Sequence, residues 1–433
     1  MLRTAAVASV VVMVTVAATA TGAPGADADR GREPGVGPGG DRWVDTWVSM
    51  PQLTEPHNMP PAPFTDGESV LRDSTLRQTV RTTVAGEKLR LRFSNAFGGA
   101  ELPLTRVSVA LPSGGAAGVP AIEPGTARQV TFAGRAATVV PMGAQVVSDP
   151  VDMKVPAGTN LTVTVHLADG QSSSSVTSHP GSRTTSHLLR GDHTTAADLP
   201  GATRTDHWYF LSGVETLVDT PRAAGLVVIG DSLTDGRGST TNGNDRWTDQ
   251  LHQRLLRSPA TDQVAVLNEG AGGNRVLRDG LGPNVLARLD RDVLVRSGAR
   301  WVLMFEGVND LGTAEATAAA QQATADDLIA AYRQIVERSH AQGLAVYGAT
   351  LTPLGGNEMY DDPAGHRERA RQRVNDWIRH SGVFDAVVDF DRAVRDPQAP
   401  TRLLPAYDTG DHLHLNPAGY RALADAVPSR LLR

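Results

Sequence analysis

The stretch VVIGDSLTDG, residues Val227–Gly236, decides how the second half of this chain folds. It opens on a β-branched run that is typical of a buried strand, and Gly-Asp-Ser-Leu follows directly. Asp and Ser are favoured at helix starts, so the pattern predicts a strand that delivers Ser232 to a helix N-terminus at a sheet edge. Backbone N–H groups at that position favour developing negative charge. The same residues also fit a tight turn with a helix cap, so the rest of the chain must decide.

After Pro221, continuous apolar runs alternate with amphipathic stretches. The alternation of strands and helices predicts an α/β fold, with a parallel sheet covered by helices on both faces. In such a sheet the active site lies at the carboxyl ends of the strands. Five runs are expected as buried strands: Leu226–Ile229, Val264–Leu267, Trp301–Phe305, Ala345–Thr350 and Val387–Phe390.

Two helices of this half can be given expected bounds. One follows Thr324, a candidate N-cap with Asp327 three residues on, and its apolar residues recur at helical spacing. The other is the final helix, which is expected over Pro417–Leu432.

From Trp43 to about Thr220 the pattern is that of β structure. Leucine and phenylalanine alternate with arginine in Lys88–Ser94, and Asn160–Leu167 alternates in the same way. Glycine and proline turns separate these runs. Many short strands predict an all-β sandwich or jelly-roll-like domain over residues 43–220, followed by the α/β domain over residues 221–433.

Four aromatic residues of the first domain, Trp43, Trp47, Trp208 and Tyr209, allow two interpretations. They would either line a platform for carbohydrate or fill the core of the β domain. Aromatic residues in alternating strands more often lie in a core, so we favour the core.

Composition limits what the protein can be. The chain has 433 residues and a formal net charge of −6, which argues against a nucleic-acid-binding protein. It has no cysteine, which excludes disulfides, thiolate catalysis and cysteine-ligated metal. Residues 1–28 resemble a secretory signal whose apolar run is too short to span a membrane, and residues 29–42 are expected to form a disordered linker. We therefore expect a secreted protein without a stable membrane anchor.

Three further blocks carry residues suited to acyl-transfer chemistry. NEGAGGN, Asn268–Asn274, follows a predicted strand, and its glycines allow backbone N–H groups to approach an oxyanion. EGVND, Glu306–Asp310, places the amide of Asn309 at the end of the next predicted strand. In DHLH, Asp411–His414, the aspartate can fold back on the second imidazole and fix its tautomer. Each block alone would also fit an ordinary loop or helix cap.

The last block has a second interpretation, a metal site formed by His412 and His414. No other clustered histidines or carboxylates in the sequence offer further ligands of the usual kind. We therefore expect His412 to be a loop residue, and the reaction to need neither a metal nor a cofactor.

Taken together, in this order and at these strand ends, the four blocks resemble the SGNH hydrolase superfamily, also called the GDSL esterases and lipases. The resemblance covers Pro221 to the C-terminus and implies a flavodoxin-like hydrolase domain. The wider sequence is similar to a secreted actinobacterial and fungal branch with an additional N-terminal β domain, although Leu415 stands where that branch has proline. The Gly-Asp-Ser, glycine, Gly-x-Asn-Asp and Asp-x-x-His blocks of the superfamily match Gly230–Leu233, Asn268–Gly273, Gly307–Asp310 and Asp411–His414.

The resemblance implies a role for five residues. Ser232 matches the nucleophile, His414 the general base and Asp411 the residue that orients this base. The oxyanion donors would be the backbone N–H groups of Ser232 and Gly273 and the side chain of Asn309; Gly273 is chosen over its neighbouring glycines by its spacing in the block. Serine needs an adjacent base to act as a nucleophile, so these roles are chemically consistent.

We therefore expect a secreted serine esterase that hydrolyses carboxylic esters, with short-chain or carbohydrate O-acetyl esters as substrates. A lipase or lysophospholipase acting on longer acyl chains is the alternative enzyme, and a non-catalytic carbohydrate-binding protein is the alternative outside enzymes. The modest aromatic content, 5%, and the lack of an obvious amphipathic lid favour the short-chain esterase. The expected partner is a small-molecule or polysaccharide ester, and the expected oligomeric state, which the sequence leaves open, is a monomer.

Overall fold

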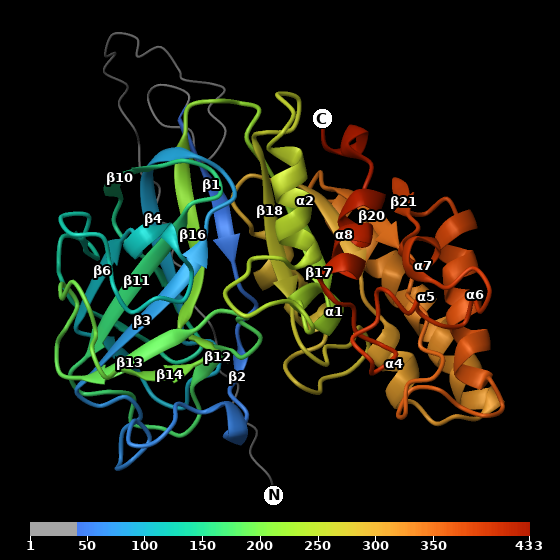
Figure 1. Ribbon diagram of the computed structural model, residues 1–433, viewed down its shortest axis with the longest axis horizontal. Coiled ribbons are helices and arrows are strands. Elements are labelled where there is room, and N and C mark those ends of the chain that lie inside the picture. The colour runs from blue at the N-terminus through green and yellow to red at the C-terminus, as the bar shows by residue number, and fades with distance from the viewer. Residues whose placement is uncertain (1–40) are drawn as a thin grey trace, which may run out of the picture.

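The computed structural model describes residues 41–433, which form two regions with different strand patterns (Figure 1). Antiparallel sheets occupy the chain from β1 (Arg42–Val48) to β16 (Leu211–Val218), and a parallel sheet begins with β17 (Ala224–Gly230). We call these parts the β region and the α/β region. The expected secretory signal, residues 1–28, lies outside the described residues. So does the expected linker, residues 29–42, except for its last two residues, and Arg42 already belongs to β1.

The β region consists of antiparallel sheets, so the predicted all-β fold is confirmed. Its other strands are β2 (Gln52–Leu53), β3 (Ser74–Arg81), β4 (Gly86–Ser94), β5 (Leu102–Leu104), β6 (Arg106–Ala110), β7 (Arg128–Val130), β8 (Thr138–Val140), β9 (Gln145–Val147), β10 (Val151–Val155), β11 (Asn160–Leu167), β12 (Thr177–His179), β13 (Ser186–Arg190), β14 (Thr203–Thr205) and β15 (Trp208–Tyr209). The two larger sheets have the orders β1-β16-β4-β10, with β9 beside β4, and β14-β13-β3-β11-β6-β7. Side chains of both sheets share one buried cluster, as in a sandwich.

Burial in the β region follows the alternation read in the sequence. Leu89, Leu91 and Phe93 of β4 are fully buried, because every second side chain of a strand points to the same face. Three of the four aromatic residues, Trp47, Trp208 and Tyr209, are also buried, so they are core residues and do not form an exposed platform.

The α/β region is built on one parallel sheet. Its strands after β17 are β18 (Val264–Gly270), β19 (Ala299–Phe305), β20 (Ala345–Ala349) and β21 (Ala386–Val388). They lie in the order β18-β17-β19-β20-β21, and every neighbouring pair is parallel. Counted along the chain, this is the order 2-1-3-4-5 of flavodoxin-like folds. The predicted fold class is therefore confirmed.

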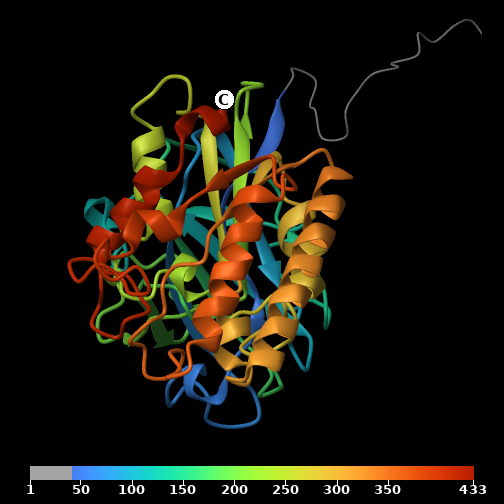
Figure 2. The ribbon, with the colours of Figure 1, turned by 90° about the vertical axis from the view of Figure 1, so that its right-hand side faces the viewer.

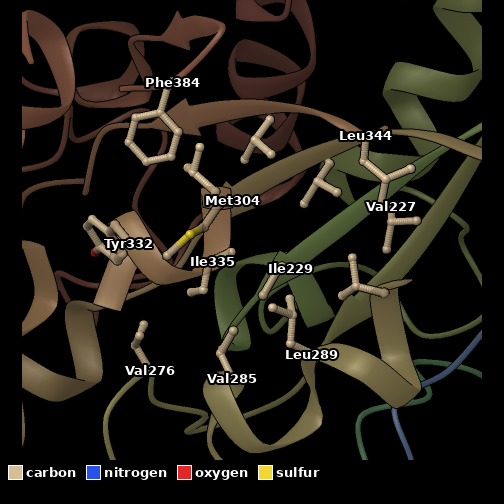
Figure 3. Packing of buried hydrophobic residues seen from close by; sticks show 14 of the residues in the cluster. Val227, Ile229, Val276, Val285, Leu289, Met304, Tyr332, Ile335, Leu344 and Phe384 are labelled. Atoms are coloured by element: carbon tan, nitrogen blue, oxygen red, sulfur yellow. The ribbon is translucent and has the colours of Figure 1, made fainter. Parts of the chain in front are cut away.

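Helices cover both faces of this sheet, because the strands carry apolar residues on both sides. The helices are α1 (Ser232–Asp235), α2 (Trp247–Leu255), α3 (Val285–Leu289), α4 (Val308–Thr313), α5 (Ala318–His340), α6 (His366–His380), α7 (Phe390–Val394) and α8 (Pro417–Ala426). Val227 and Ile229 of β17 face α3, α5 and α6, whereas Leu226 and Val228 face α2, α7 and α8. Figure 2 shows α5 and α6, in orange, packed side by side over the first face. Figure 3 shows Ile229 and Met304 of the sheet near Tyr332 and Ile335 of α5.

The expected start of the long helix is wrong. Thr317, not Thr324, is the N-cap of α5, and its side chain accepts a hydrogen bond from the Ala320 N–H. Thr324 lies inside the helix and donates to the Ala320 carbonyl oxygen. The three alanines after Thr317 are strong helix formers and extend the helix toward its N-terminus.

Two further boundaries also differ from expectation. The strand expected over Val387–Phe390 ends at Val388, because Asp389 caps α7 by accepting a hydrogen bond from the Arg392 N–H. The final helix ends at Ala426, and a separate 3₁₀ turn follows Pro428, whose missing N–H cannot continue the helix. Within residues 41–433, no helix is both long enough and apolar enough to cross a membrane.

The two regions meet along β1 and β18, which lie side by side in Figure 1. The Asp45 carboxylate of β1 accepts a hydrogen bond from the Ser297 N–H (2.7 Å), and His252 of α2 bonds to the Thr83 carbonyl oxygen (2.6 Å). Ser297 directly precedes β19, so the first contact lies at the amino end of the parallel sheet; at the carboxyl end of β17, His179 of the β region contacts Asp235 of α1 (2.9 Å).

Candidate active site

Ser232 is the first residue of α1, directly after β17. The Asp231 side chain caps this helix by accepting a hydrogen bond from the Leu233 N–H (2.9 Å). Gly230 allows a close approach, since a Cβ there would lie 2.1 Å from the Thr234 hydroxyl oxygen. Gly236 then ends the single turn with a φ of 97°, a conformation that favours glycine. This turn therefore places Ser232 at the carboxyl edge of the sheet, as the sequence predicts.

Ser232, His414 and Asp411 lie in one hydrogen-bonded line. The Ser232 Oγ is 2.8 Å from the His414 Nε2, and the His414 Nδ1 is 2.6 Å from the Asp411 Oδ2. The other carboxylate oxygen of Asp411 accepts hydrogen bonds from the backbone N–H groups of Leu413 (3.0 Å) and His414 (2.8 Å). With Nδ1–H donated to the carboxylate, Nε2 is left free to accept a proton from the serine hydroxyl.

Burial and hydrogen bonding set the charges of this line. Burial acts to raise the pKa of Asp411, but the hydrogen bonds from the His414 backbone and ring outweigh it, and the pKa lies well below its usual range. Burial lowers the pKa of His414, which the Asp411 carboxylate only partly opposes. Near neutral pH, the carboxylate is therefore charged and the imidazole is neutral, as a general base requires.

Gly273 and Asn309, the other two predicted site residues, also lie at the cleft that Ser232 lines. Gly273 has a φ of 69° and lines the same cleft as Ser232. The Asn309 amide nitrogen donates to the Asn274 carbonyl oxygen (2.8 Å), and its oxygen accepts a hydrogen bond from the Tyr360 hydroxyl (2.7 Å). These two bonds fix the amide plane and leave the second N–H of the amide available.

The cleft has a volume of about 830 Å³ and contains all five predicted site residues on its walls: Ser232, Gly273, Asn309, Asp411 and His414. Both regions of the molecule line it. From the β region come Gln52, Glu55, Asn58, Pro180, Gly181, Arg183 and His207. The cleft is therefore shared between the regions, although Ser232, Asp411 and His414 all belong to the α/β region.

Three buried carboxyl groups lie close to the serine turn. Burial raises the pKa of Asp231 to about 7 and that of Asp310 to about 6. Burial, followed by the nearby Asp231, raises the pKa of Glu306 well above its usual range, and neither Glu306 oxygen has a hydrogen-bond partner among residues 41–433. Partly protonated carboxyl groups place less negative charge near a developing oxyanion than three ionised ones would.

His412 lines the mouth of the cleft. Its Nδ1 is 2.6 Å from the Asp408 carboxylate, and its φ of 60° is unusual for a histidine. In the part of the chain that the structure describes, no group of three His, Asp or Glu side chains is arranged to hold a metal ion. Among these residues, the structure therefore offers no third ligand for a metal held by His412 and His414.

Two contacts of this site have no signal in the sequence. Tyr360, which holds Asn309, lies in a loop without a recognisable motif, 51 residues from its partner. His179 of the β region contacts Asp235 of α1 across 56 residues. Only the three-dimensional structure brings either pair together.

A family model and several solved structures are similar to the second half of this chain. The family model described as GDSL-like Lipase/Acylhydrolase matches residues 228–422, a span that contains all five predicted site residues, and confirms the predicted class of carboxylic ester hydrolase. Among solved structures, a GDSL-like lipase from Bacteroides thetaiotaomicron has 16% identity, with 49% of this chain and 89% of that chain covered and a TM-score of 0.36. An acetylxylan esterase from Geobacillus stearothermophilus has 23% identity, with coverages of 48% and 94% and a TM-score of 0.36. No curated protein gives a significant match.

Proposed function

We propose, on the premise that residues 228–422 form a GDSL-like acylhydrolase domain, that this protein hydrolyses carboxylic esters with Ser232 as the nucleophile. His414 is the general base, and Asp411 orients it. The observation that carries the proposal is the line from the Ser232 Oγ to the His414 Nε2 (2.8 Å) and from the His414 Nδ1 to Asp411 (2.6 Å). Asp411 also stabilises the imidazolium that forms when His414 accepts the proton.

The reaction has two steps. The Ser232 oxygen attacks the ester carbonyl carbon while its proton moves to the His414 Nε2, and a tetrahedral oxyanion forms. The oxyanion collapses, the C–O bond to the alcohol breaks, and His414 returns the proton to the leaving alcohol. Water, deprotonated by His414, then attacks the acyl-enzyme and releases the acid and free Ser232.

Three donors are assigned to the oxyanion: the N–H groups of Ser232 and Gly273 and the side-chain amide of Asn309. The fixed amide plane of Asn309 supports its role, because donors that do not need to reorient during the reaction stabilise a transition state best. Each such donor typically contributes roughly 3–4 kcal/mol.

We assign short-chain or carbohydrate O-acetyl esters as the substrates. The β-region side of the cleft carries amides, a carboxylate and an imidazole, from Gln52, Glu55, Asn58 and His207. Such groups match the hydroxyls of a polar alcohol, whereas a long acyl chain needs a largely apolar wall. The proposal of secretion rests on residues 1–28 alone and stays a prediction.

The test is hydrolysis of a p-nitrophenyl ester series, acetate through palmitate, by the wild type and by Ser232→Ala. We expect a maximum at acetate and a loss of about 10⁴-fold or more in Ser232→Ala, with the fold unchanged by circular dichroism. Ser239→Ala is the matched control, because its hydroxyl bonds only to the Gly236 carbonyl oxygen nearby, and we expect full activity. Retained activity in Ser232→Ala would overturn the mechanism, and a maximum at palmitate would replace the short-chain assignment by a lipase.

Acetylated and deacetylated xylan then separate the remaining possibilities. Release of acetate from the acetylated polymer supports a carbohydrate ester as the substrate. Hydrolysis of p-nitrophenyl acetate without release of acetate from the polymer would instead favour a small-molecule ester.

A further inference from the structure

Asp235 is the last residue of α1, three residues after Ser232, and only 2% of it is exposed. Its carboxylate points to the β region, where the His179 Nε2 lies 2.9 Å from Oδ1 and the Arg183 guanidinium 3.4 Å from Oδ2. The turn that carries the proposed nucleophile therefore ends in an ion pair with the other region of the molecule.

His179 is itself held firmly on the β-region side. Its Nδ1 is 2.9 Å from the Met50 carbonyl oxygen, and its ring stacks on Trp208 with 5.7 Å between ring centres. The imidazole, 5% exposed, therefore lies between a backbone carbonyl oxygen and a buried carboxylate.

The backbone of the β region also approaches Asp235 closely. A Cβ on Gly181 would lie 1.8 Å from the Asp235 Oδ2, so only glycine fits there without a shift. On the other side, Arg246 donates to the Asp235 carbonyl oxygen (3.0 Å) and also to the carbonyl oxygen of Ser182 in the β region. Asp235 is therefore held through both its side chain and its backbone.

The charge of Asp235 agrees with this arrangement. Burial acts to raise the pKa of Asp235, but the hydrogen bond and charge of His179, with Arg183 and Arg246, outweigh it and leave the pKa below its usual value. Asp235 is thus ionised despite full burial, and breaking the pair would leave an uncompensated charge.

We propose that the β region positions the nucleophile through this contact, with His179, Arg183 and Asp235 as positioning residues. A single helical turn has little stability of its own, so α1 needs external support at the end opposite its cap. The hydrogen bond between Ser232 and His414 requires this support, because a misplacement of about 1 Å at a reacting group can cost about 100-fold in rate. The proposal rests on the assignment of Ser232 as the nucleophile.

The test compares His179→Gln and Asp235→Ala with a matched control at the same interface, His252→Gln. His252 is also buried, and it also joins the two regions through a ring nitrogen, at 2.6 Å from the Thr83 carbonyl oxygen, but it lies outside the cleft. With p-nitrophenyl acetate, well below the melting temperature, we expect kcat to fall about 10–100-fold in the first two variants, with KM within twofold. His252→Gln should lower the melting temperature and leave kcat unchanged.

Two further variants test the pair as a unit. His179→Gln combined with Asp235→Ala should lose little more than either change alone, since the two side chains act together. Asp235→Asn keeps an oxygen that accepts from His179, so it should retain more activity than Asp235→Ala. If His179→Gln does not fold, Arg183→Gln, at a partly exposed site, should still lower kcat several-fold.

Labelling of Ser232 by a fluorophosphonate separates this proposal from the function itself. Slower labelling of the His179 and Asp235 variants, with unchanged labelling of the His252 variant, supports positioning. Wild-type kcat and labelling rates in His179→Gln and Asp235→Ala, while Ser232→Ala is inactive, would overturn the positioning role alone. Full activity of Ser232→Ala would instead overturn the proposed function.

Discussion

The β region and the α/β region border the same cleft but contribute different kinds of groups. The α/β region holds the line of Ser232, His414 and Asp411, and these side chains bond to one another. The β region adds polar side chains to the wall and contacts the serine turn at Asp235. The proposed catalytic residues thus all lie in one region. The other region contributes side chains that shape the cleft and contact the turn of Ser232.

The difference follows from how each region is built. Parallel strands end at the same edge of a sheet, so residues far apart in sequence meet there, as Ser232 and His414 do across 182 residues. In the β region, the inward-facing side chains of the antiparallel strands are instead buried in a core that the sheets share. What remains for the cleft are loops, such as the segment around Glu55, which is held by the amides of Gln52 (2.6 Å) and Asn58 (2.9 Å).

The largest effect should come from the reactive line itself. Asp411→Asn is expected to lower kcat about 10⁴-fold, because an amide can donate to Nδ1 and so favours the wrong tautomer of His414. Steady-state kinetics on p-nitrophenyl acetate measure this loss. Asp408→Asn is the matched control, since Asp408 makes the same kind of contact, 2.6 Å, to His412 in the same loop. If Asp408→Asn lowered kcat as much as Asp411→Asn does, the loss could not be assigned to the Asp411–His414 pair alone.

The second-largest effect concerns the interface between the two regions. Arg296 is buried, lies 2.7 Å from Glu269, and is also influenced by the charges of Asp45 and Glu215 in the β region. Arg296→Leu removes the buried cation that pairs with Glu269, so we expect the free energy of unfolding to fall by about 3–5 kcal/mol at pH 7. Urea denaturation measures this change.

Exposed Arg300→Leu is the control for Arg296→Leu and should change stability by about 0.5 kcal/mol or less. The kcat of folded Arg296→Leu should stay close to that of the wild type, because Arg296 lies outside the cleft. A large loss of kcat without a loss of stability would contradict this prediction, because it would mean that Arg296 acts on the active site and not on the interface between the regions.

The sequence predicted the α/β region well because its signals are local. Each strand is a continuous apolar run, and the blocks of Ser232, Asn309 and His414 stand near where a strand ends or the last helix begins. The predicted start of α5 was wrong because Thr317 and Thr324 are both suitable N-cap residues. The sequence pattern alone does not distinguish them.

The contacts between distant residues could not be predicted. His179 lies in a β-strand pattern, where a buried histidine usually serves the core, and Asp235 lies in a turn, where aspartate is common anyway. Neither local pattern indicates that His179 and Asp235 contact each other. The role of the β region at the site therefore depends on how the two regions pack.

The third effect concerns Asn309, the proposed oxyanion donor. Asn309→Ala is expected to lower kcat by about 10²–10³-fold with little change in KM, because the donor acts mainly in the transition state. Tyr360→Phe removes only the hydroxyl that holds the Asn309 oxygen at 2.7 Å, so its loss should be about tenfold or less. A rise in KM alone for Asn309→Ala would mean that the amide binds the substrate and does not stabilise the oxyanion.

The smallest effect is a shift in the pH profile. In the proposed mechanism His414 must be neutral to accept the serine proton. Burial holds its pKa below the usual 6.5, so kcat/KM should fall tenfold per pH unit only below that value. The charge of Arg237 contributes to this lowering, so Arg237→Gln should move the acid limb to higher pH by a fraction of a unit, measured at low salt. Exposed Arg421→Gln on α8 should leave the limb in place. Arg183 of the β region acts in the same direction, and an equal upward shift in Arg183→Gln would mean that the β region tunes the base as well as positioning the nucleophile.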